Sequence, residues 1–135
     1  MRPSLSALKL FSVVFLAMVI THGIDHVRQG RSLGTALLLT GAVSLVAAGL
    51  VVGLSLTDNP SAPLAALAVG LVTAPGLVAV HLIPRWNPAF SDPYPGLGLD
   101  AFSWLSLLAY ALSAVVIATL GGRLIRSRRT PTGVS

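Results

Sequence analysis

The segment with the most chemical potential in this sequence is the short polar stretch 21–31, which follows a long apolar run. It contains His22, Asp25 and His26, and so holds two of the three histidines of the chain. A helix would place these three side chains on one face, within an arc of roughly 100°. Two histidines at positions i and i+4 are a spacing that can chelate a metal ion. His81 is the third histidine and could complete such a site.

These residue types predict the kind of metal. The chain has no cysteine, and imidazole and carboxylate ligands without thiolate suit Zn, Cu(II) or non-haem Fe. We therefore expect a metal site made by His22, His26 and His81. Asp25, or an acid from a loop, would complete the ligand set or hold an imidazole in place.

Two other interpretations fit the same residues. A bis-histidine haem could lie between His81 and one of the earlier histidines, as in cofactor-binding helix bundles. The structural interpretation needs no ligand at all, because polar residues at a helix end can hydrogen-bond to lipid headgroups. In that case Asp25 and Arg28, three residues apart, would form a local ion pair.

The elements that must position these residues are predicted to cross a membrane. Hydrophobic residues make up 54% of the 135 residues and charged residues only 10%, and the mean hydropathy is +0.84. Segments of about twenty apolar residues are long enough to cross a bilayer. We expect an all-α, four-transmembrane-helix bundle forming one domain over residues 1–126, followed by a polar cytoplasmic tail over 127–135. The predicted spans are residues 5–27, 33–56, 64–83 and 101–125.

The net charge of +5 predicts contact with lipid rather than with nucleic acid, because the basic residues stand at the ends of apolar runs. Gly49 and Gly53 form a GxxxG pattern that allows close helix packing, within the chain or against a membrane partner or second copy. The sequence shows neither a nucleophile–base–acid set nor a Gly-rich phosphate loop, so we expect no enzymatic activity.

Topology predicts which residues can meet. Six Lys and Arg residues flank the termini and three flank the opposite side, which predicts a multi-pass protein of the plasma membrane with both termini in the cytoplasm. The first and third spans run in the same direction, so the ends that carry all three histidines share one face. We expect the long connection 84–100 to form a structured extracytoplasmic loop there, with Trp86 and Tyr94 at headgroup depth and Asp100 capping the last span.

Several motifs also resemble those of small four-span bacterial integral membrane proteins of unknown function. The resemblance involves His22-x-x-Asp25-His26-x-x-Gln29, His81-Leu82-Ile83-Pro84-x-Trp86, Ser91-Asp92 and Asp100-x-x-Ser103-Trp104. It implies a four-helix membrane fold and assigns no activity or ligand. An accessory subunit without a ligand therefore stays an alternative to a metal-binding protein.

Overall fold

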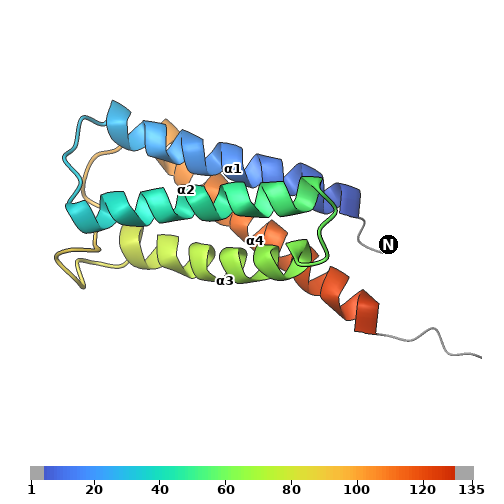
Figure 1. Ribbon diagram of the computed structural model, residues 1–135. Helices are drawn as coiled ribbons and strands as arrows, with labels where there is room; N and C mark the ends of the chain where they lie inside the picture. Colours follow the sequence, from blue (N-terminus) through green and yellow to red (C-terminus); the bar gives the residue numbers. More distant parts are fainter. Residues whose placement is uncertain (1–4, 130–135) are drawn as a thin grey trace, which may run out of the picture.

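The computed structural model describes residues 5–129, and these form a bundle of four helices (Figure 1). The helices are α1 (Leu5–Arg28), α2 (Thr35–Leu56), α3 (Ala62–His81) and α4 (Ala101–Arg129). Each is long and apolar enough to span a bilayer. The predicted all-α bundle with four candidate membrane spans is confirmed.

The helix boundaries differ slightly from the predicted spans. Helix α4 continues to Arg129, so residues 127–129, which we had assigned to a polar tail, belong to the helix. The reason is that no glycine or proline follows Gly122 before that point, and Arg is a good helix former. The remainder of the predicted tail, 130–135, lies outside the described residues.

The two ends of the bundle differ in what they hold. Figure 1 shows the start of α1, the end of α4 and the α2–α3 turn together at one end, where Lys9 of α1 pairs with Asp58 at 2.7 Å. The opposite end holds the α1–α2 turn and the long connection between α3 and α4. As predicted, the C-terminal ends of α1 and α3 therefore lie at the same end.

The closest helix packing joins α3 to α4. A Cβ atom added to Gly70 would lie 2.3 Å from the backbone oxygen of Ala114, and one added to Gly121 would lie 2.4 Å from that of Pro63. By contrast, a Cβ at Gly49 or Gly53 would meet nothing within 4 Å. The close contact expected at this GxxxG pair is therefore not made within the chain, because those glycines face outward from α2.

The connection 82–100 folds back onto the end of α3. The backbone N–H groups of Asp92 and Tyr94 donate to the carbonyls of Val80 and His81, at 2.9 and 2.8 Å. The indole N–H of Trp86 donates to the carbonyl of Ala79 at 2.6 Å. Tyr94 is only 1% exposed, so its side chain lies inside the bundle end; the headgroup depth of Trp86 and Tyr94 stays a prediction. The Tyr94 ring packs on His81, with 4.6 Å between centroids, which explains its burial.

The start of α4 is tied to the same end. The Asp100 carboxylate accepts a hydrogen bond from the backbone N–H of Ser103 at 3.0 Å, which confirms the predicted N-cap. Arg28 also binds this carboxylate at 2.8 Å. The hydrogen bond from Arg28, together with that from the Ser103 backbone, lowers the pKa of Asp100 to about 2.

Candidate metal centre

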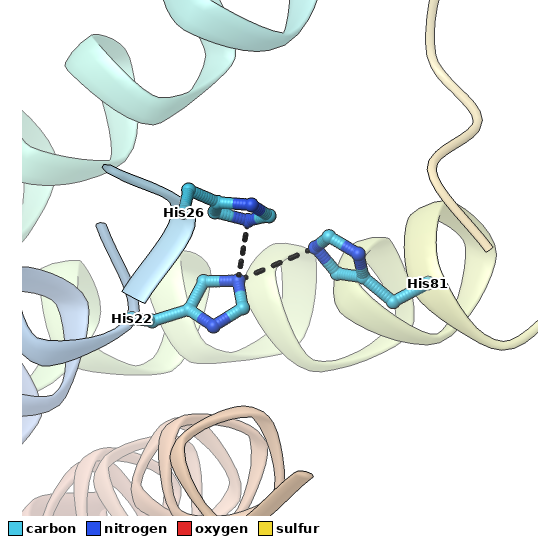
Figure 2. A group of neighbouring side chains, drawn as sticks. All are labelled: His22, His26 and His81. Carbon is cyan, nitrogen blue, oxygen red and sulfur yellow. Dashed lines mark hydrogen bonds between the residues drawn. The ribbon is translucent and has the colours of Figure 1, made fainter. Parts of the chain in front are cut away.

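The three histidines meet at the end of the bundle that carries the long connection. His22 and His26 lie one turn apart near the end of α1, and His81 is the last residue of α3. Figure 2 shows their rings turned toward one another. His22 is 6% exposed and His81 is 4% exposed. Three imidazoles from two helices thus form one largely buried group, the histidine site.

The ring nitrogens of this site are close enough to share one ion. The Nε2 atom of His22 lies 3.3 Å from the Nε2 of His81 and 3.3 Å from the Nε2 of His26 (Figure 2). One ring nitrogen from each of the three histidines lies within 4.8 Å of the other two. The predicted set His22, His26 and His81 is therefore brought together as expected.

The hydrogen bonds around His81 determine its tautomer. Its Nδ1 atom lies 3.1 Å from the backbone oxygen of Asp92. Because a carbonyl oxygen can only accept, Nδ1 carries the proton and Nε2 is left with a lone pair. That lone pair points toward His22. This is the protonation pattern that a histidine bound to a metal through Nε2 requires.

The Asp92 carboxylate lies behind two of the imidazoles. Its Oδ2 atom is 3.9 Å from Nδ1 of His26 and 3.8 Å from Nδ1 of His81. Its Oδ1 atom forms an ion pair with Arg31. Asp92 is 7% exposed, so it places a buried negative charge beside the two Nδ1 atoms. This charge favours a proton on both of these nitrogens and so leaves both Nε2 atoms as acceptors.

The three Nε2 atoms cannot all be paired by hydrogen bonds to one another, because one proton is missing. If His26 and His81 both present lone pairs at Nε2, an Nε2–H on His22 can donate to only one of them at a time. The Nδ1 atoms of His22 and His26 and the Oδ2 atom of Asp92 are buried and have no hydrogen-bond partner among the described residues. A cation at the Nε2 atoms would leave the two Nδ1 atoms as they are, but it would attract all three Nε2 lone pairs together and so remove the competition for one proton.

Asp25 does not join the histidine site. Its carboxylate accepts hydrogen bonds from Arg28 at 2.8 Å and from Gln29 at 2.7 Å. Arg28 also reaches the hydroxyl of Ser103 on α4. Asp25 is therefore used in the local ion pair of the structural interpretation, where it ties α1 to α4.

The sequence leaves the orienting acid open between Asp25 and the loop acids, and it predicts no role at the metal site for Asp92, Arg31 or Tyr94. Tyr94 closes the site from the loop side, and its burial raises the pKa of its hydroxyl. The signals in the sequence were the place of Asp92 and Tyr94 in the long aromatic connection that follows His81, and the place of Arg31 at the end of the polar stretch 21–31.

No family model matches this chain, and neither curated proteins nor solved structures give a significant match. The class of the protein therefore follows from its own features. It is a helical membrane protein with four candidate spans and a cluster of three histidines at one end of the bundle.

Proposed function

We propose that this protein binds one transition-metal ion at the histidine site. The observation that carries the proposal is the convergence of three Nε2 atoms at the ends of two separate helices, with His22 lying 3.3 Å from each partner. His22, His26 and His81 would be the ligands. Asp92 would hold two of the rings in the ligand tautomer, and Arg31 would hold Asp92.

The spacing of the nitrogens favours a tetrahedral ion. In a tetrahedral site with zinc–nitrogen bonds of about 2.0–2.1 Å, neighbouring ligand nitrogens are roughly 3.3–3.4 Å apart. The two 3.3 Å separations at His22 match this value. Square-planar copper with bonds of similar length would require about 2.9 Å. Zinc is therefore the preferred ion, with three protein ligands and a fourth position for another molecule.

The geometry does not favour haem. A flat macrocycle has to fit between the two axial imidazoles of a bis-histidine haem. Here the Nε2 atoms of His22 and His81 are in contact at 3.3 Å, and His26 is equally close to His22. The helices would have to move apart before a porphyrin could enter.

We place the site at the outer face of the plasma membrane. Six of the nine basic residues flank the termini and the remaining three flank the histidine end. A cytoplasmic excess of Lys and Arg is the usual bias in membrane proteins. On this orientation the site would take up metal from outside the cell.

The proposal is tested by measuring the metal content of protein purified in detergent. We expect about one equivalent of zinc, the stoichiometry of a single site. The double variant His22→Ala/His26→Ala should lose it, whereas Asp58→Asn at the opposite end should keep it. Helical content and elution volume show whether each variant is folded. Folded wild-type protein that contains no metal, and takes up none from added Zn²⁺, would overturn the proposal.

A second candidate is an accessory subunit that binds another membrane protein. The observation in its favour is the outward-facing pair Gly49 and Gly53 on α2, where an added Cβ would meet nothing within 4 Å. Small residues of this kind allow a second helix to approach closely. Co-purification of one stoichiometric partner, lost in Gly49→Leu, would support this candidate, and unchanged co-purification in that variant would exclude this contact.

A further inference from the structure

A cavity of about 590 Å³ extends from the histidine site between α1, α2 and α3. All three histidines and Asp92 line it. Leu33 lines it from the α1–α2 turn, and on α2 its wall runs from Leu37 to Leu45, a helical rise of about 12 Å. Its volume falls within the range of roughly 300–1,000 Å³ that is typical of small-molecule sites.

The cavity exists because α2 separates from the bundle near the histidine site. The buried residues of α2 are Ala48, Val51 and Ser55, all in its C-terminal half, and none of the residues 35–47 is buried. Small residues line the space on both sides. A Cβ added to Gly41 of α2 or to Gly76 of α3 would meet nothing within 4 Å.

The cavity opens toward the lipid. Its lining includes Ile24, Leu38 and Val72, which are 60%, 58% and 73% exposed. These residues lie in helices long and apolar enough to span the membrane. A molecule dissolved in the bilayer could therefore reach the histidine site from the side, without passing through water.

The walls have one polar end and a largely apolar remainder. Imidazole nitrogens lie at the polar end, where the charge of Arg31 is paired with that of Asp92. Further from the site, the hydroxyls of Thr40 and Ser44 donate to backbone carbonyls of their own helix, at 2.8 and 2.9 Å. This arrangement matches a molecule with an uncharged polar group at one end of an apolar body.

We propose that this cavity binds an uncharged, membrane-dissolved amphiphile. Its hydroxyl or carbonyl oxygen would lie at the histidine site, and its apolar body would lie between α1, α2 and α3. The proposal deepens the proposed function, since a metal ion held by three imidazoles has a position for such an oxygen. Imidazoles also hydrogen-bond to oxygen directly, so binding can be tested with and without metal.

The test uses the full chain in phosphatidylcholine nanodiscs and a dodecanol probe with a photoreactive diazirine in its alkyl chain. Peptide mapping should find the label concentrated on 37–45 of α2 and 72–80 of α3. Gly41→Leu and Gly76→Leu place a side chain in the cavity and should each reduce this labelling about tenfold. The matched control Gly49→Leu, on the same helix but outside the cavity, should leave it unchanged.

Competition tests the polar end. Unlabelled 1-dodecanol should displace the probe, whereas dodecane should compete about fivefold less well, because it lacks one hydrogen bond worth about 1 kcal/mol. Even labelling of all lipid-facing helix surfaces, or equal competition by the two compounds, would overturn the proposal. So would a dimer that Gly41→Leu dissociates, since α2 would then cover the cavity with a second copy.

The outcome can be separated from that of the metal proposal. Metal content is measured on the same samples, and labelling is repeated after the metal has been removed with a chelator. Protein that binds metal but shows no preferred labelling would refute the cavity proposal alone. Preferred labelling of protein that never binds metal would refute the metal proposal alone.

Discussion

Replacing Asp92 with asparagine should weaken zinc binding without disrupting the fold. Asparagine has the shape of aspartate, but its amide is neutral. It would remove the buried negative charge that lies 3.9 and 3.8 Å from Nδ1 of His26 and His81. Arg31 would lose its ion pair but keep its hydrogen bond to Gln29 at 2.9 Å, and its side chain is 27% exposed and can be solvated by water. The loss of that pair should cost about 1.5–3 kcal/mol of stability, because it removes a hydrogen bond between charged groups of which one is buried.

The size of the effect follows from the geometry. Removing a carboxylate behind a metal-bound histidine commonly lowers metal affinity about 10- to 100-fold. We expect the lower end for Asp92→Asn, because both Nδ1 distances exceed a direct hydrogen bond. In addition, His81 keeps its 3.1 Å hydrogen bond to the backbone oxygen of residue 92. The predicted loss is about tenfold, or about 1.4 kcal/mol.

The assay is competition for Zn²⁺ against a chromophoric chelator, with protein in detergent. Asp58→Asn is the matched control, because it makes the same substitution at the opposite end of the bundle and should leave the affinity unchanged. Circular dichroism of each variant shows that the helices are intact. If folded Asp92→Asn bound zinc as tightly as the wild type, the carboxylate would have no role in holding the imidazoles.

Three further predictions test the fold and its orientation. Gly70→Ala should destabilise the protein by about 1–3 kcal/mol, because its Cβ would lie 2.3 Å from the Ala114 oxygen. The control Gly49→Ala should leave the stability unchanged. Equal unfolding midpoints of the two variants in detergent titrations would contradict the α3–α4 packing. Asp100 has a pKa of about 2 against an ordinary value of 3.8, so its stabilising effect is present above pH 3.8 and is lost as the pH falls toward 2. The wild type should therefore lose more stability than Asp100→Asn between these values, and parallel losses would mean that the carboxylate is not held by Arg28 and Ser103. Because the chain has no cysteine, Ser32→Cys should react with an impermeant maleimide in intact cells and Ser61→Cys only after lysis; the reverse pattern would invert the proposed orientation.

The fold was predictable because bilayer thickness restricts the possible structures. Four long apolar runs have to form spanning helices, and alternating directions place the ends of α1 and α3 together. With helical periodicity, this was enough to bring His22, His26 and His81 to one end. The apolar runs show no alternation of polar and apolar residues of the kind that indicates a half-buried strand.

Asp92 could not be chosen from the sequence, because its position depends on the path of an irregular connection. That path is set by backbone hydrogen bonds to Val80 and His81. Because any residue type can make such bonds, they cannot be recognised in the sequence. Asp25 showed the stronger sequence signal, since it shares a helix face with His22 and His26. However, the guanidinium of Arg28 and the amide of Gln29 bind its carboxylate on the side that faces α4.

The glycine contacts show a similar limit. Gly49 and Gly53 match the helix-packing pattern, whereas Gly70 and Gly121 make the close approaches. Spacing within one helix does not specify which neighbour it will face. That choice depends on the small residues of the other helix, and in this bundle α4 supplies Ala114 and Ala118 opposite Gly70.

The central claim is that three imidazoles hold one ion. X-ray absorption at the zinc edge of the purified, zinc-loaded protein tests it most directly, because outer-shell scattering counts imidazole rings. We predict three imidazole nitrogens at about 2.0 Å and loss of the imidazole signal in His22→Ala/His26→Ala. A shell of oxygen alone, or a wild-type spectrum that the double variant reproduces, would contradict the claim.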